Sequence, residues 1–117
     1  GEWSGCTAAQ IAERWPEQFA VWRADPDARP PGGESFTDVR ERVVPVISDL
    51  VRRYRGHTVV IVTHAAVTKM VLVHALGVPS AAAYRLRIDT ASVSGFTVEQ
   101  DGRTMVWAVN EVGHLPE

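Results

Sequence analysis

The stretch that decides the fold class of this chain is T-V-V-I-V-T-H-A-A-V-T-K-M-V-L-V-H-A-L, from Thr58 to Leu76. Residues 58–63 are all β-branched and have no polar alternation, which is typical of a strand buried on both faces of an α/β sheet. The apolar segment after His64 ends at Gly77, and a glycine in that place is a helix stop signal. We therefore predict an inner strand, then His64, then a helix.

His64 is the most informative single residue of the sequence. The prediction places it at the carboxyl end of the strand, where the helix begins. Ligands of open α/β sheets bind at this edge, and the free N–H groups of a helix N-terminus favour an anion there. We expect an anion-binding site around His64. The alternative is a structural histidine that only caps the helix.

Composition narrows the class of protein. The 117 residues suffice for one small domain or part of one, and 45% of them are apolar. A net charge of −2 argues against a nucleic-acid or membrane-surface protein, and no apolar run approaches the roughly 20 residues of a membrane span. Cys6 is the single cysteine, so we expect no disulfide and a cytoplasmic location. The four histidines lack metal-ligand spacing, and we expect no metal or other cofactor.

Two short helices are predicted before residue 25. Thr7 and Gln10 match a capping box that opens the first helix, and Pro16 opens a second that runs to about Ala24. Three aromatic residues at spacings of four and three share one helical face, which indicates either a packing stripe or a ligand-stacking surface. They are Trp15, Phe19 and Trp22.

A long amphipathic helix is predicted next. Ser35 can cap it, with Asp38 three residues later, and Gly56 ends it. Pro45 lies inside and removes one backbone hydrogen bond, so we expect a kink. The apolar positions recur with helical period; they are Val39, Val43, Ile47, Leu50, Val51 and Tyr54.

The last third is predicted to be β-rich. Alternation over Tyr84–Ile88 predicts a strand, and Asp101-Gly102 predicts a hairpin between strands at 93–100 and 104–109, followed by coil from Asn110. No parallel neighbour for residues 58–63 precedes Tyr84. We therefore predict that the chain is part of a domain, and that a missing amino-terminal segment or another copy of the chain completes the sheet.

Six motifs in order resemble the carboxyl-terminal two-thirds of the histidine phosphatase (phosphoglycerate mutase-like) superfamily. They are G-x-W-x-G-x-T at residues 1–7, P-G-G-E-S at 31–35, Arg42, V-T-H at 62–64, A-S-V-S at 91–94 and N-x-x-x-H-L at 110–115. The resemblance implies a three-layer α/β/α fold with a mixed, mostly parallel sheet. It also implies phosphoryl transfer through a phosphohistidine on a small-molecule phosphate ester.

Site residues follow from the same resemblance. His64 matches the second histidine of the family, which helps to bind the transferred phosphoryl group. Ala65 stands where relatives have glycine and can still offer its backbone N–H. Glu34 and Ser35 match a loop near the active-site mouth; the alternative role for Ser35 is that of a helix cap. His57 and His74 are expected to be structural or exposed, and His114 to pack near the chain end.

The Arg-His-Gly motif that carries the nucleophile in the family is absent from the sequence. Residues 1–117 are therefore predicted to form a partial domain that is inactive alone. The complete domain is expected to be a phosphatase; the alternatives are a phosphoglycerate mutase, or a catalytically inactive phosphate-binding or interaction module.

Overall fold

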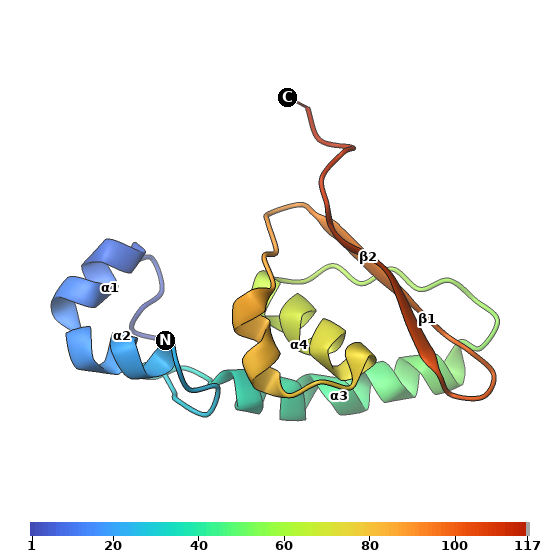
Figure 1. Cartoon of the computed structure of the whole chain (residues 1–117), viewed down its shortest axis with the longest axis horizontal. Coiled ribbons are helices and arrows are strands. Elements are labelled where there is room, and N and C mark those ends of the chain that lie inside the picture. Colours follow the sequence, from blue (N-terminus) through green and yellow to red (C-terminus); the bar gives the residue numbers. More distant parts are fainter. Residues whose placement is uncertain (117) are drawn as a thin grey trace.

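The computed structural model of this chain describes residues 1–116. Its α-helices are α1 (Ala8–Arg14), α2 (Pro16–Trp22), α3 (Phe36–Arg53) and α4 (Ala65–Leu76), and a 3-10 helix, η1 (Ser80–Arg85), follows. The strands β1 (Val93–Val98) and β2 (Thr104–Glu111) come last. The α1–α2 pair lies at one end of the molecule, and α3, α4, η1 and the hairpin form the body (Figure 1).

Local sequence sets the helix ends, as predicted. Thr7 and Gln10 form a reciprocal capping box at α1, with hydrogen bonds of 3.1 and 2.9 Å. The last helix stops at Gly77, whose φ of 68° is the left-handed conformation that glycine adopts without strain. The α2 helix ends at Trp22, two residues before the expected end. Pro45 lies within α3, which continues through it to Arg53.

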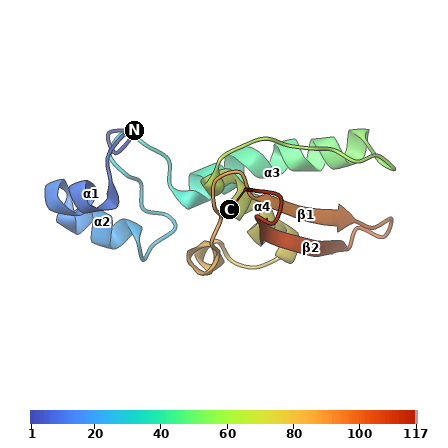
Figure 2. The same cartoon turned by 90° about the horizontal axis from the view of Figure 1, so that it is seen from above.

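The core lies between α3 and α4. Seen from above, α4 is placed between α3 and the hairpin (Figure 2), and it contacts α3, η1 and β2. This position explains why α4 is apolar nearly all round. Burying one valine, isoleucine or methionine side chain stabilises a fold by about 1.5–3 kcal/mol. The buried cluster consists of Val39, Val43, Ile47, Met70, Val73 and Ala83.

The predicted hairpin is confirmed. β1 and β2 pair antiparallel, with Phe96 opposite Val106 and with irregular register around Gly95. At the turn, the N–H of Gly102 donates to the Glu99 carbonyl at 2.9 Å, and Gly102 has a φ of 87°. A glycine with positive φ at this place is what a three-residue hairpin loop requires.

The segment at residues 58–63 does not form the expected buried strand. It runs as a long unpaired trace from α3 to α4 (Figure 1), and none of its backbone groups bonds to another backbone group within residues 1–116. Val60 is 84% exposed and Val62 is 94% exposed. An inner strand needs neighbouring strands at both edges and packed layers on both faces, and no strand among the described residues pairs with residues 58–63.

The radius of gyration and the exposed surface area also indicate that the fold is incomplete. Its radius of gyration is 15.7 Å, whereas a compact domain of this length has about 13 Å. It exposes 8329 Å² to solvent, against about 6,300 Å² for a folded protein of this mass. The excess surface includes the apolar residues 59–62. The chain is thus an incomplete α/β domain.

The strand predicted at Tyr84–Ile88 is wrong. The 3-10 helix η1 occupies Ser80–Arg85, and Leu86 is extended without a strand partner. Pro79 precedes η1 as its N-cap, and the alanines that follow favour helical geometry over a strand. The expected coil from Asn110 also begins later, because β2 continues to Glu111; Glu117 lies outside the described residues.

Candidate functional site

The first turn of α4 presents free backbone donors. His64 is the N-cap in extended conformation, and its side chain makes no capping bond. The N–H of Thr68 already donates to the His64 carbonyl at 3.1 Å. Within residues 1–116, the N–H groups of Ala65, Ala66 and Val67 have no backbone acceptor. Such a set of donors, at the positive end of the helix dipole, is suited to an anion.

His64 itself is exposed and borders a cleft of ≈ 470 Å³, here named the histidine cleft. Ala66 lines it from α4, Trp3 from the amino-terminal loop, Glu34 from the loop before α3, and Arg42 from α3. No hydrogen bond joins the His64 ring to another of the described residues. The ring is therefore available to a ligand in this cleft.

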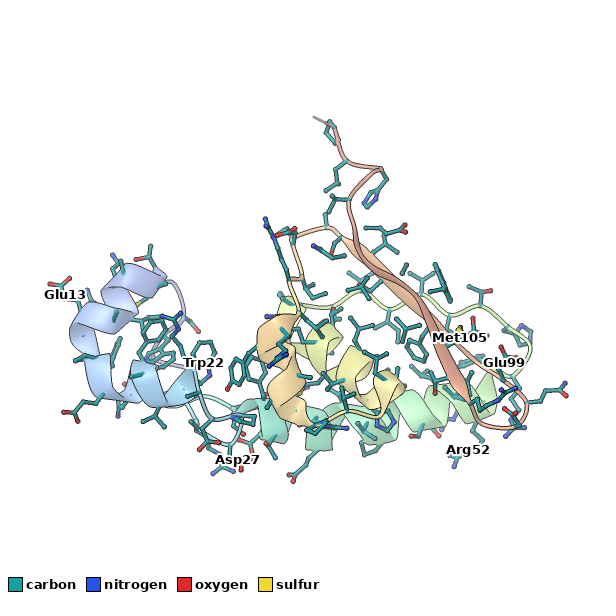
Figure 3. All side chains as sticks on the ribbon, in the orientation of Figure 1. Glu13, Trp22, Asp27, Arg52, Glu99 and Met105 are labelled. Carbon is teal, nitrogen blue, oxygen red and sulfur yellow. The ribbon has the colours of Figure 1, made fainter. Side chains whose placement is uncertain are left out.

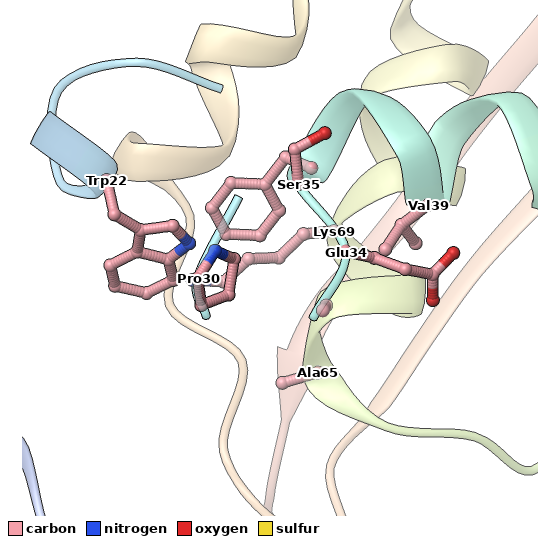
Figure 4. A pocket seen from close by; sticks show the side chains of 9 residues that line it. Trp22, Pro30, Glu34, Ser35, Val39, Ala65 and Lys69 are labelled. Carbon is pink, nitrogen blue, oxygen red and sulfur yellow. The ribbon is translucent and has the colours of Figure 1, made fainter. Parts of the chain in front are cut away.

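A second cleft of ≈ 270 Å³, here named the aromatic cleft, opens beside the first. Its walls include Trp22, Phe36, Ala65 and Lys69 (Figure 4). Four residues line both clefts, so the two are adjacent; they are Pro30, Glu34, Val39 and Ala66. The structure thus brings all four predicted site residues, Glu34, Ser35, His64 and Ala65, to these two adjacent clefts, here together named the groove.

Glu34 is held in place by Arg42. Two parallel hydrogen bonds of 2.9 and 3.0 Å join the guanidinium to the carboxylate. The Glu34 carboxylate raises the pKa of Arg42, first through the side-chain hydrogen bond and then through charge attraction. In Figure 4 the carboxylate points away from Trp22 and Pro30. The positive charge of Arg42 therefore offsets the negative charge of Glu34, so Glu34 repels an anion in the groove less than a free carboxylate would.

Ser35 is a helix cap. It is 2% exposed, and its Oγ accepts from the N–H of Asp38 at 2.9 Å. The Asp38 carboxylate in turn accepts from the N–H of Ser35 and from the guanidinium of Arg29. The hydrogen bonds from Arg29 and then from the Ser35 backbone hold the pKa of Asp38 far below its ordinary value. The cap fixes where α3 begins and thereby where Glu34 is placed.

The aromatic stripe packs internally. Trp3 is placed at its centre, with ring centroids 6.3 Å from Trp15, 5.9 Å from Phe19 and 5.5 Å from Trp22. Trp22 stacks on Phe36 at 5.8 Å, and this contact joins the α1–α2 pair to the body. Figure 3 shows Trp22 on the side of this pair that faces the body. The stripe is a packing surface, and Trp22 also walls a cleft.

The remaining histidines lie elsewhere. His57 and His74 are exposed and border neither cleft. His114 places Nε2 2.8 Å from the Ala91 carbonyl oxygen. The side-chain amide of Asn110 accepts a hydrogen bond from the backbone N–H of Asp89 and donates one to the Asp89 carboxylate. The backbone N–H of Asn110 donates to the hydroxyl of Ser94. The two carboxyl-terminal sequence motifs therefore join the end of β2 to the segment before β1.

Two negative observations concern ions and membranes. No group of three or more histidine, cysteine, aspartate or glutamate side chains among the described residues could hold a metal ion. Between residues 1 and 116, no helix has both the length and the apolar character needed to cross a bilayer.

Sequence reasoning missed three features of the groove. Lys69, the only lysine of the chain, lines the aromatic cleft. Its position in an otherwise apolar helix, four residues after Ala65, was a usable signal. Nothing in the sequence indicates that Pro30 lines both clefts, because that depends on how the loop before α3 folds back. The pairing of Glu34 with Arg42, eight residues apart, also depends on the tertiary path.

Three curated relatives are similar in sequence. A bifunctional protein of Mycobacterium tuberculosis is 43% identical over 115 residues, which are 98% of this chain and 32% of the relative. Phosphoserine phosphatase 1 of Hydrogenobacter thermophilus is 30% identical over 118 residues, covering 100% of this chain and 56% of the relative. A 2,3-bisphosphoglycerate-dependent phosphoglycerate mutase of Methylobacterium radiotolerans is 31% identical over 116 residues, covering 86% and 55%.

Two solved structures are similar in fold. Bacillus stearothermophilus YhfR superposes with a TM-score of 0.84 at 29% identity, covering 99% of this chain and 58% of that chain. A mycobacterial glucosyl-3-phosphoglycerate phosphatase in complex with inorganic phosphate gives 0.80 at 29% identity, covering 95% and 59%. This chain thus spans about a third to three-fifths of the length of these proteins.

The family model described as histidine phosphatase superfamily (branch 1) matches residues 1–111. That range includes the α4 N-terminus, both clefts and the hairpin. The chain belongs to branch 1 of the histidine phosphatase superfamily.

Proposed function

We propose that residues 1–117 are the carboxyl-terminal part of a phosphomonoester hydrolase that acts on a small-molecule phosphate ester. The observation that carries the proposal is the uncapped N-terminus of α4, where His64, with an unengaged ring, and Ala66 and Val67, with free backbone N–H groups, line one cleft. These groups can bind the equatorial oxygens of a phosphoryl group, on which charge is spread during transfer. Membership of a family of phosphatases and mutases supports this role.

The reaction is proposed to proceed in two displacements. A histidine on a segment upstream of Gly1 attacks phosphorus, a P–N bond forms, and the P–O bond of the ester breaks. The leaving oxygen takes a proton from an acidic side chain on the same upstream segment, which later accepts a proton from the attacking water, and the leaving group departs as an alcohol. Water then attacks phosphorus and the P–N bond breaks, which releases inorganic phosphate and restores the histidine. His64 and the backbone N–H of Ala65 hold the transferred group in both steps.

Hydrolysis is favoured over mutase activity by the short loop at residues 25–33, which leaves little room for a substrate-enclosing insertion. Similar proteins include phosphatases for phosphoserine and for glucosyl-3-phosphoglycerate, as well as a mutase. Phosphoglycerate mutase activity is the second candidate. A catalytically inactive phosphate-binding or interaction module is the third, and it would keep the α4 site without a nucleophile.

The incomplete sheet also needs a partner. We propose that an upstream segment, or the same segment of another copy, pairs with residues 58–63. Separately, the Nε1 donor of Trp3 is buried without an acceptor among residues 1–116, and such a group costs about 1–3 kcal/mol. The proposed compartment is the cytoplasm, where the free thiol of Cys6 would stay reduced.

The test compares two proteins: the 117 residues alone, and the same residues preceded by several tens of upstream residues, here named the extended chain. We expect the extended chain to hydrolyse phenyl phosphate and the 117 residues to show no turnover. An inactive extended chain that still binds phosphate would support the inactive module instead. His64-dependent turnover by the 117 residues alone would contradict the assigned roles.

A further inference from the structure

Lys69 stands one helical turn from the proposed phosphate site. It is four residues after Ala65 on α4, and both residues line the aromatic cleft. Four residues advance a helix by about 6 Å. The Lys69 side chain crosses the cleft in the direction of Pro30 and Trp22 (Figure 4). A cation is thus placed beside the phosphate site, on the side where the organic part of an ester would lie.

The Lys69 charge has no partner among the described residues. Every ion pair found within residues 1–116 uses an arginine as its cation. The acidic residue that lines the same cleft is Glu34, and Arg42 already binds both of its oxygens. Lys69 is half-buried, so its apolar stem can lie against the cleft wall while its ammonium stays free of any carboxylate among the described residues. The cleft therefore favours an anionic ligand.

The remaining walls are apolar. The rings of Trp22 and Phe36 are nearly parallel, with an interplanar angle of 22°, and Pro30 and Val39 add further apolar surface. Ligand sites commonly combine such walls with a few polar groups that fix orientation. Here the polar groups are the α4 donors at one end and Lys69 beyond them.

We propose that the aromatic cleft is the leaving-group subsite and that Lys69 determines specificity for phosphate esters whose organic part carries a carboxylate. The inference rests on the proposed function, since it takes the phosphate to lie at the α4 N-terminus. The carbon skeleton then lies against Trp22 and Phe36, and the Lys69 ammonium donates to the carboxylate. Lys69 binds substrate and takes no part in bond making or breaking.

The test uses the extended chain with phenyl phosphate and 3-carboxyphenyl phosphate, which differ by the carboxylate. In Lys69→Met, we expect kcat/KM for the carboxylated ester to fall about tenfold, the scale of one charge-assisted hydrogen bond. The value for phenyl phosphate should change less than about twofold. Lys69→Arg should keep most of the preference, because it retains the charge. The matched control is Arg52→Met, which removes a cation from the exposed far end of α3 (Figure 3) and should change neither value.

The kinetics of the Lys69 variants with the two esters distinguish the proposed subsite from other roles of Lys69. Equal loss for both esters in Lys69→Met would place Lys69 at the phosphoryl group and overturn the subsite. Unchanged values for both esters would also overturn it. If the Lys69→Met protein melts early, the comparison of Lys69→Arg and Lys69→Gln with the two esters decides in the same way. No turnover of either ester by the unmodified extended chain would refute the proposed function and with it this inference, whereas turnover without a Lys69-dependent preference refutes the subsite alone.

Discussion

Glu34 and Arg42 face each other across the start of α3 and share two hydrogen bonds of 2.9 and 3.0 Å at the junction of the two clefts. The pair is partly exposed, with 56% of the Arg42 side chain and 47% of the Glu34 side chain accessible. Its contribution to stability is therefore small. Its effect on an anion in the groove is larger, because the guanidinium cancels a carboxylate that would otherwise repel that anion.

The first prediction concerns this charge balance. Arg42→Met leaves Glu34 unpaired beside the phosphate site, and we expect the inhibition constant of inorganic phosphate and the KM for an aryl phosphate to rise several-fold in the extended chain. Glu34→Gln should lower both. The double variant should return close to the starting values. A double variant whose KM stays as high as that of Arg42→Met would contradict the charge-compensation account, because removing the Glu34 charge would then have no effect.

Ser35 provides the second prediction, because its capping and substrate-binding roles give different results. Ser35→Ala removes the acceptor for the N–H of Asp38 and should destabilise the extended chain by about 1 kcal/mol. The kcat/KM of the folded protein should be nearly unchanged. Ser48→Ala, at an exposed position of the same helix, is the matched control and should not lower the melting temperature. A large loss of kcat/KM with normal stability would instead assign Ser35 to the substrate.

The third prediction follows from the lowered pKa of Asp38. A carboxyl group whose folded pKa lies below its unfolded value stabilises the fold above the unfolded pKa of about 3.9. This contribution is lost as the pH falls from about 4 towards the folded pKa. Asp38→Asn should therefore melt below the unmodified protein at pH 6, and the difference should shrink below pH 4. A difference in melting temperature that stays constant across this range would contradict the assignment.

Local signals made the helices and the hairpin predictable. The capping boxes at Thr7 and Ser35, the glycine at 77 and the Asp101-Gly102 turn each depend on a few neighbouring residues, so the structure reproduces them. The position of His64 at the start of α4 follows from the same kind of signal.

The 3-10 helix at Tyr84 and the lining of the aromatic cleft depend on tertiary contacts, which the sequence does not indicate. The alternation at Tyr84–Ile88 resembles a strand, but Tyr84 packs against Phe36 and donates its hydroxyl to the Trp22 carbonyl from a 3-10 helix. The aromatic cleft is lined by α2, by the loop before α3, and by α3 and α4, so no local pattern predicts that Lys69 and Trp22 share it.

The fourth prediction tests the completion of the sheet. If an upstream segment pairs with residues 58–63, the side chain of Val60 becomes buried, although it is 84% exposed here. Val60→Lys should then destabilise the extended chain by at least about 3 kcal/mol, because it buries an unpaired charge. Val46→Lys, at a 57% exposed position of α3, is the control and should change stability by less than about 0.5 kcal/mol. Equal, small effects at both positions in thermal melts would refute the proposed pairing.

The most direct test of the phosphate site compares His64→Ala with His74→Ala in the extended chain, by steady-state hydrolysis of an aryl phosphate and by thermal melting. His64 borders the cleft and is exposed, so its loss should leave the melting temperature nearly unchanged. It should lower kcat/KM by a factor of about 10²–10³, as expected when one preorganised donor to developing charge is removed. His74→Ala, on the exposed side of α4 near its end, should keep the rate. If His64→Ala instead lowers the melting temperature and spares the rate of the folded protein, His64 is a structural cap and the proposed site is wrong.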